Sequence, residues 1–172
     1  MLPLAYDLKS PMMIRYPRGK SDLPKTKHAP LEKGRSEVLR EGNDAALWAV
    51  GAETGTAMEI AGLLERDGIS CKVVNTRFLK PLDKAALLRD ARNMPLITLE
   101  NTLSGTGLDM LADRLLITEK HCGILHFAWP ADTPVPHGSN ADLRGKFGLT
   151  AAAAAETIRN RFFAKTKEQE PV

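Results

Sequence analysis

The stretch "ALWAVGAETGTAMEIAGLLERDG", residues 46–68, decides the fold class. Its first five residues, 46–50, form a short apolar run that is typical of a buried strand. A helical period follows, and its apolar stripe consists of Ala57, Ile60, Ala61 and Leu64. Thr56 and Glu59 have the spacing of a capping box, and Gly68 stands where a helix would stop. The stretch therefore predicts a strand that turns directly into a helix.

The same pattern recurs along the rest of the chain. Apolar runs that favour strands are spaced about 25 to 28 residues apart, at 46–50, 71–76, 96–100 and 124–128. Helical patterns fill or follow the gaps, at 56–68, 82–93, 107–116 and 150–163, and Asp83 is a plausible N-cap. Strands that alternate with helices indicate a mostly parallel sheet with helices on both faces. We therefore expect a three-layer α/β/α domain, with 36–42 as an additional edge strand.

The composition is that of an ordinary globular protein. The 172 residues suffice for one domain with a buried core, and 43% are hydrophobic against 26% charged. Residues 1–40 hold nine basic and four acidic side chains (net +5), and the remaining 15 basic and 17 acidic side chains give −2. The basic excess is too small and too dispersed for a nucleic-acid surface, so we expect no nucleic-acid partner.

Other features of the sequence bear on its location. The two cysteines, Cys71 and Cys122, are too few and too far apart for a disulfide framework, which favours a reducing compartment. No apolar run approaches the roughly 20 residues that cross a bilayer, and the first ten residues lack the pattern of a signal peptide. We therefore expect a cytoplasmic protein with no membrane partner.

The turn at 50–56 resembles a dinucleotide-binding loop, because it follows an apolar run and opens a helix. Gly51 and Gly55 are its only glycines, whereas the dinucleotide fingerprint needs three. The next apolar run closes on Asn75 and Thr76 rather than on an acidic residue. We favour a tight strand-to-helix turn without a nucleotide.

His121, Cys122 and His126 are close in the sequence and are candidate metal ligands. A metal site needs a third or fourth ligand with suitable geometry, but His126 falls inside a predicted strand and the other two precede it. We interpret them as core and surface residues and predict no metal site.

Two further turns follow predicted strands, at the edge where doubly wound sheets bind ligands. In "RFLKPLDK" Arg77 and Lys80 could face a ligand, but a simple turn with Arg77 paired to a carboxylate is favoured. In "LENTLSGTG" (99–107) Glu100 could meet an anion or a partner, and a tight turn explains the glycines equally well.

The N-terminal stretch "PMMIRYPRGK" (11–20) predicts a short strand, Met12–Tyr16, that ends in a proline, an arginine and a glycine. Arg15 and Arg18 lie three residues apart at this turn, an arrangement that usually faces an anion. Residues 20–35 are polar and carry two prolines, which predicts a linker or an exposed loop.

Four segments together resemble the C-terminal part of the 1-deoxy-D-xylulose-5-phosphate synthases, a thiamine-diphosphate-dependent family of the transketolase superfamily. They are "IRYPRGK" (14–20), "NTRFLKPLDK" (75–84), "ITLENTLSGTG" (97–107) and "PVPHGSNADLRGKFGLTAAAAAETI" (134–158). The motif "RF-x-KPLD" is shared in looser form by the β subunits of 2-oxo-acid dehydrogenases, whereas the last segment favours the synthases.

The resemblance implies a transketolase C-terminal-type fold and an order of domains. Residues 1–19 would be the last helix and strand of a preceding pyrimidine-binding domain, and 20–35 its linker. Residues 36–165 would form the C-terminal domain, and 166–172 a frayed tail.

The resemblance also implies an activity. The full enzyme would join pyruvate, after decarboxylation, to D-glyceraldehyde 3-phosphate, giving 1-deoxy-D-xylulose 5-phosphate and CO₂ for isoprenoid and thiamine biosynthesis. Thiamine diphosphate and Mg²⁺ would be bound by the diphosphate- and pyrimidine-binding domains, because this sequence lacks the Gly-Asp-Gly motif and the activating glutamate. The chain would be a fragment or a split subunit, inactive alone, that joins the rest of a homodimeric enzyme.

Particular residues acquire roles from the same resemblance. Arg18 matches the arginine that holds the phosphate of the aldehyde acceptor, and Arg15 and Tyr16 are weaker candidates. The candidates for a substrate channel or a subunit interface are Arg77, Lys80, Glu100 and His137. No catalytic residue is expected in this chain. Two alternatives stay open: the C-terminal domain of a dehydrogenase β subunit, which passes its acyl group to a lipoyl domain, and a non-catalytic interaction module.

Overall fold

A five-stranded sheet forms the centre of the protein in a computed structural model that describes residues 1–16 and 29–164. The strand order is β1-β3-β2-β4-β5. The strands are β1 (Glu37–Arg40), β2 (Ala45–Ala49), β3 (Cys71–Asn75), β4 (Leu96–Leu103) and β5 (Ile124–Trp129). β2 to β5 are parallel, and β1 pairs antiparallel with β3. The mostly parallel sheet and the additional edge strand are therefore confirmed.

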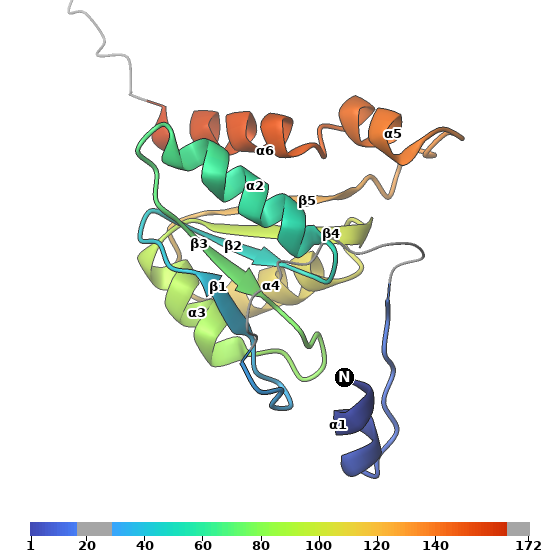
Figure 1. Cartoon of the computed structure of the whole chain (residues 1–172). Coiled ribbons are helices and arrows are strands. Elements are labelled where there is room, and N and C mark those ends of the chain that lie inside the picture. Colours follow the sequence, from blue (N-terminus) through green and yellow to red (C-terminus); the bar gives the residue numbers. More distant parts are fainter. Residues whose placement is uncertain (17–28, 165–172) are drawn as a thin grey trace, which may run out of the picture.

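Helices cover both faces of this sheet (Figure 1). One face carries α2 (Glu53–Glu65) and α6 (Ala151–Ile158), which continues into a π-helical turn, Arg159–Phe163. The other face carries α3 (Lys84–Asn93) and α4 (Leu108–Leu116). A short helix, α5 (Asn140–Lys146), precedes α6. The three-layer α/β/α architecture is confirmed.

The central strand β2 supplies both hydrophobic cores because its side chains alternate between the faces of the sheet. Leu47 packs in the core under α2 and α6, and Trp48 packs in the core under α3 and α4. Both are fully buried, and burying one such side chain stabilises the fold by roughly 1.5–3 kcal/mol. The predicted helix stripes also lie inward, since Ile60 and Leu64 of α2 face the first core and Leu87 of α3 the second.

The helix starts depend partly on contacts that sequence spacing does not reveal. Asp83 is the N-cap of α3 and accepts a hydrogen bond from the Ala86 N–H at 3.3 Å, as predicted. The predicted capping box at Thr56 is wrong, because α2 begins a turn earlier at Glu53 and has no side-chain cap. Near its other end Gly68 adopts a φ of +79°, which permits the chain to turn there.

The N-terminal segment lies beside the sheet domain rather than within it. It begins with the helix α1 (Leu2–Asp7), which lies apart from the sheet (Figure 1). None of the residues of α1 is buried. The predicted strand Met12–Tyr16 is wrong: these residues form no β ladder, and a strand requires a hydrogen-bonded neighbour. Burial still alternates, with Met12 and Ile14 half-buried and Met13 and Arg15 exposed. Residue 16 is the last described residue before the gap, so Arg18 and most of the predicted linker lie outside the described residues.

A membrane span was also sought among the helices. Within residues 1–16 and 29–164, none is both long enough and apolar enough to cross a bilayer.

Candidate functional site at the carboxyl edge of the sheet

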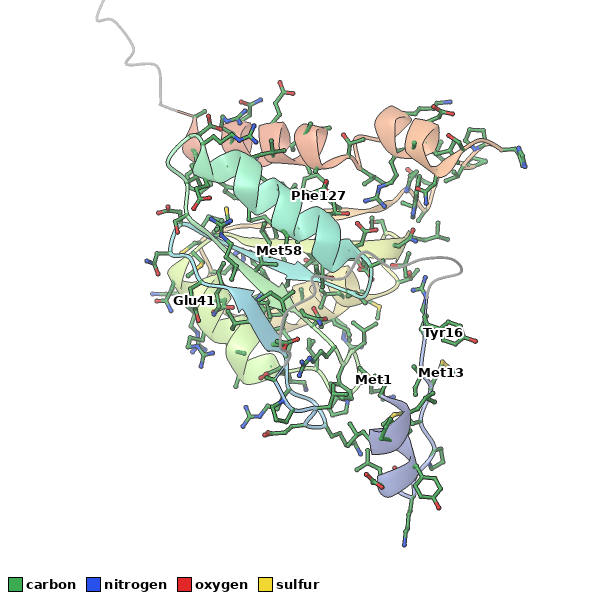
Figure 2. The ribbon with its side chains drawn as sticks, in the orientation of Figure 1. Met1, Met13, Tyr16, Glu41, Met58 and Phe127 are labelled. Carbon is green, nitrogen blue, oxygen red and sulfur yellow. The ribbon has the colours of Figure 1, made fainter. Side chains whose placement is uncertain are left out.

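The carboxyl ends of the parallel strands meet the N-terminal segment at one edge of the domain. The Arg15 guanidinium donates a hydrogen bond to the Asn101 carbonyl of β4 at 2.8 Å. A pocket of about 670 Å³ opens beside this contact, lined in part by Arg15, Tyr16, Glu53, Asn101, Asn140 and Arg144. Figure 2 shows Tyr16 and Met13 on the extended segment, and both side chains are more than four-fifths exposed. Arg15 and Tyr16, which the sequence singled out, therefore line the same pocket.

A bulge in β4 creates the contact point for Arg15. Leu99 pairs with Phe127 of β5, but the next pair is Leu103 with Trp129, so β4 contains extra residues between the two pairs. Residues in a bulge are left out of the regular ladder, and bulges are common beside functional sites. Here the bulge includes Glu100 and Asn101. Asn101 contacts Arg15, whereas Glu100 contacts the start of α4.

Glu100 points into the protein and stabilises the start of α4. Its carboxylate oxygens accept hydrogen bonds from the backbone N–H groups of Leu108 at 3.0 Å and Asp109 at 2.9 Å. A carboxylate there also complements the positive end of the helix dipole. The Glu100 side chain is nearly fully buried. Both of its observed contacts lie at the turn between β4 and α4, as expected for a residue that holds a tight turn.

Asp109 completes the same turn from inside α4. Burial alone would raise the pKa of Asp109, but hydrogen bonds from the N–H groups of Gly105, Met110 and Gly107 bring that pKa below its usual value. This carboxylate therefore stays ionised and fixes the glycine-rich loop between β4 and α4.

Arg144 and Glu53 also line this pocket. Nη1 of Arg144 lies 2.8 Å from Oε1 of Glu53, and Nη2 lies 2.7 Å from Oε2. This hydrogen-bonded pairing raises the pKa of Arg144. The two parallel hydrogen bonds tie α5 to the start of α2 and leave little capacity on either group for a ligand.

Arg77 is committed to a structural contact at the end of β3. Its guanidinium lies 2.6 Å from the Glu37 carboxylate and also donates to the carbonyls of Ala29 and Pro30. Its side chain is 7% exposed, which fits the predicted pairing with a carboxylate. Lys80 is exposed, and both residues line a second pocket of about 680 Å³ that Arg15 also lines.

The remaining candidates lie apart from this site. His137 is exposed in the segment between β5 and α5. His126 lies in β5 as predicted, with its ring nitrogens 2.7 Å from Thr98 Oγ1 and 3.0 Å from Asp113 Oδ1. Among residues 1–16 and 29–164, no cluster of three acidic, histidine or cysteine side chains could hold a metal ion.

Several residues of the site were missed by sequence reasoning. The pairing of Glu53 with Arg144 spans 91 positions and leaves no local signal. A local signal was present for the helix α5, because Ser139 and Asp142 have the spacing of a helix start. The Ser139 hydroxyl accepts a hydrogen bond from the Asp142 N–H at 3.2 Å. Asn101 stood inside a quoted motif but was not recognised as a contact of Arg15.

Comparison with known proteins identifies the fold. The family model described as "Transketolase, C-terminal domain" matches residues 34–153, which is most of the chain and includes every strand of the sheet. The chain belongs to the transketolase C-terminal domain family. Among curated relatives of this domain, 1-deoxy-D-xylulose-5-phosphate synthase of Heliobacterium modesticaldum is 38% identical over 164 residues. That alignment covers 92% of this chain and 25% of the relative.

A second relative carries a closely similar name. 1-Deoxy-D-xylulose-5-phosphate synthase 2 of Geobacter sulfurreducens is 39% identical over 165 residues, which cover 92% of this chain and 26% of the relative. The chain thus spans about a quarter of the length of these relatives. A solved structure described as a split gene transketolase, inactive beta4 tetramer, superposes with a TM-score of 0.72 at 29% identity, covering 80% of this chain and 45% of that chain.

The described residues of this transketolase C-terminal domain do not fit a thiamine diphosphate site. Glu53 and Glu100, two buried carboxylates at this edge, are already engaged by Arg144 and by the start of α4. No acidic cluster in the described part of the chain could hold the Mg²⁺ that accompanies a diphosphate.

Proposed function

We propose that this chain serves as the C-terminal part of a 1-deoxy-D-xylulose-5-phosphate synthase. The complete enzyme would convert pyruvate and D-glyceraldehyde 3-phosphate into 1-deoxy-D-xylulose 5-phosphate and CO₂. The observation that carries the proposal is the alignment with synthases over about nine-tenths of the chain, which extends beyond the family domain. The same relatives favour the synthase over a dehydrogenase β subunit.

The N-terminal residues would have a separate origin in this enzyme. Residues 1–19 are proposed to complete the pyrimidine-binding domain, 20–35 to link it to the C-terminal domain at 36–165, and 166–172 to form a tail. The exposure of α1 and the hydrogen bond from Arg15 to Asn101 support a segment that belongs elsewhere yet rests against this domain. Thiamine diphosphate and Mg²⁺ would be bound by the other domains.

Within this chain, Arg18 is the residue proposed to hold the phosphate of the aldehyde acceptor. A guanidinium can bind a phosphate through two parallel hydrogen bonds, which a lysine cannot match. Arg15 and Tyr16 line the pocket at the carboxyl edge and would support this site. Lys80 and His137, both exposed, are proposed to face the substrate channel or a subunit interface, with Arg77 and Glu100 acting through the elements that they hold.

The chain alone is proposed to be inactive and to self-associate. The solved relative at 29% identity, described as an inactive tetramer of a split-gene transketolase, supports both statements. We further propose a homodimeric complete enzyme in the cytoplasm, where two unpaired cysteines such as Cys71 and Cys122 are common. Sedimentation showing only monomer at high concentration would contradict self-association.

A chimaera tests the synthase proposal directly. This chain replaces the quarter of the Heliobacterium modesticaldum synthase with which it aligns, and product formation from pyruvate and D-glyceraldehyde 3-phosphate is measured. We expect activity from the chimaera and none from the isolated chain, which should also show no calorimetric binding of thiamine diphosphate with Mg²⁺. A folded, dimeric chimaera without synthase activity would refute the proposal.

A further inference from the structure

A further pocket opens beside α3, and we call it the α3 pocket. Its volume is about 410 Å³, which is within the usual range of small-molecule sites. It shares no lining residue with the pocket at the carboxyl edge that Arg144 lines. Its walls come mainly from the segment 29–36, from strands β1 to β3 and from α3. The apolar part of this lining consists of Val38, Trp48, Val74, Ala85 and Ala86.

The segment 29–36 is held against the domain near both of its ends. The Arg77 guanidinium donates to the carbonyls of Ala29 at 3.0 Å and Pro30 at 3.2 Å. The backbone N–H and the hydroxyl of Ser36 each donate to Asp83 at 3.0 Å. The wall that this segment contributes to the α3 pocket is therefore anchored to the domain.

A buried ammonium group in the lining has unused hydrogen-bonding capacity. The Lys72 side chain is 11% exposed, and its Nζ lies 2.7 Å from Oδ1 of Asp90. An ammonium carries three N–H donors, and within residues 1–16 and 29–164 Asp90 is the only hydrogen-bond partner of this one. Because a buried donor without an acceptor is costly, an acceptor atom in the pocket would complete the Lys72 group.

The buried carboxylates of the α3 pocket have their donors within the protein. Asp90 takes the Lys72 ammonium on one oxygen, and its other oxygen accepts from Nε1 of Trp48 at 3.0 Å. Asp83 accepts from Ser36 and from the Ala86 N–H. Neither carboxylate needs a cation from a ligand.

The exposed part of the lining adds further donors. Arg89 of α3 is exposed, and its guanidinium has no partner in the described parts of the chain. Arg35 and Glu32 are also exposed and are 4.0 Å apart, which is a loose pairing. The open capacity of the pocket therefore lies on cationic donors, namely Lys72 and Arg89, beside an apolar surface.

We propose that the α3 pocket binds a small organic anion. Lys72 and Arg89 receive its carboxylate or phosphate group through charge-assisted hydrogen bonds, and its apolar part lies against Val38 and Val74. The inference goes beyond the proposed function and does not depend on it, because every residue that carries it belongs to the sheet domain or to the segment 29–36.

The indole groups of the chain report binding without any assay of activity. The chain has two tryptophans. The Trp48 indole N–H shares Asp90 with Lys72, whereas that of Trp129 donates to Asn101 and Trp129 does not line the α3 pocket. In ¹H–¹⁵N spectra of the full chain at pH 7, we expect benzoate or phenyl phosphate to shift the Trp48 indole signal to saturation and to leave the Trp129 signal unchanged.

Neutral benzamide and two substitutions test the chemistry and the place of binding. Benzamide keeps the ring but not the charge, and Arg89→Ala removes one cation, so each should weaken binding at least about fivefold. Ala85→Leu fills space in the pocket from an exposed position of α3 and should abolish the saturable shift. Lys72→Met is avoided because it would leave Asp90 buried without its cation.

Each substitution has a matched control outside the lining of the pocket. Arg92→Ala removes an exposed arginine of the same helix that pairs with Glu119, and Ala152→Leu enlarges an exposed residue of α6. Both controls should bind benzoate as the unsubstituted chain does.

The relative affinities of the two anions show which anionic group the α3 pocket prefers, and saturable binding of either supports the proposal. Equal affinities for benzoate and benzamide would refute an anionic ligand. Shifts that do not saturate, or unchanged affinity in Arg89→Ala and Ala85→Leu, would refute the site.

Discussion

Arg144 of α5 and Glu53 of α2 are joined by two parallel hydrogen bonds of 2.8 and 2.7 Å, although 91 residues separate them in the chain. The carboxylate side chain is 7% exposed and the arginine side chain 20% exposed. The pair therefore closes one wall of the pocket and attaches α5, none of whose residues is buried, to the rest of the domain.

Breaking this pair should cost more stability than an ordinary surface ion pair. Arg144→Ala leaves a buried carboxylate without its partner, which we expect to lower the free energy of unfolding by about 2–3 kcal/mol. Arg144→Lys should cost about half as much, because an ammonium cannot reproduce both parallel hydrogen bonds. Urea denaturation of the chain measures both values. A double variant with Glu53→Ala that is as costly as the sum of the single variants would show that the two groups do not interact.

Gly107 is required by the buried carboxylate of Glu100. A Cβ at position 107 would lie 1.9 Å from Oε2 of Glu100, and that side chain cannot move without losing its hydrogen bonds to Leu108 and Asp109. We expect Gly107→Ala to lower the free energy of unfolding by at least about 2 kcal/mol. Thermal denaturation provides the measurement.

Gly62 offers a matched control for that substitution. It lies within α2, and an added Cβ would meet nothing within 4 Å. Gly62→Ala should therefore raise the free energy of unfolding by about 0.5–1 kcal/mol, because alanine is the better helix former. Equal effects of the two substitutions would contradict the steric argument.

Asp83 should make stability depend on pH in the acid range. Burial alone would raise the pKa of Asp83, but hydrogen bonds from the backbone N–H and hydroxyl of Ser36, both 3.0 Å long, and from the Ala86 N–H bring that pKa below its usual value. A lowered pKa in the folded state means that the stabilisation is present above the unfolded value and is lost as pH falls through the folded value.

The substitution Asp83→Asn tests this dependence. At pH 7 it should cost about 1–2 kcal/mol, since it removes a charged N-cap and a charged link between α3 and the segment before β1. The difference from the unsubstituted chain should shrink as the pH falls below about 4. Denaturation at pH 7 and pH 3 gives both values. A difference of the same size at the two pH values would exclude the carboxylate as its source.

The fold could be predicted from local periodicity, whereas the site depends on contacts between distant residues. The strand β2 is a continuous apolar run, because a strand inside a parallel sheet is buried on both faces, and that signal is local. The predicted strand Met12–Tyr16 had the right composition, but none of the described residues pairs with it. A strand forms only beside a hydrogen-bonded neighbour, and the composition of the segment itself does not reveal whether such a neighbour is present.

The contrast between local signals and distant contacts also explains why the candidate site was only partly predicted. Arg15 was noticed because of its spacing from Arg18, but its contact with Asn101 spans 86 positions and depends on a bulge that no sequence pattern revealed. Glu100 was quoted as a residue that could meet an anion or a partner, whereas its carboxylate accepts from two backbone N–H groups of α4. The start of α2 was placed one turn late because Glu53 is held by Arg144 rather than by a local cap.

The last prediction concerns Arg18, which lies outside the described residues and is proposed to bind the phosphate of the acceptor. In the complete synthase, Arg18→Ala removes a charge-assisted hydrogen-bonded pair worth roughly 2–4 kcal/mol. We expect the KM for D-glyceraldehyde 3-phosphate to rise about thirty- to several-hundredfold and the KM for pyruvate to stay unchanged, because pyruvate carries no phosphate. Arg18→Lys should recover only part of the affinity, since an ammonium binds a phosphate as a point charge. Steady-state kinetics with each substrate varied in turn makes the comparison, with Arg92→Ala as a control for the loss of an exposed arginine. An unchanged acceptor KM, or an equal rise for both substrates, would show that Arg18 does not hold the acceptor phosphate.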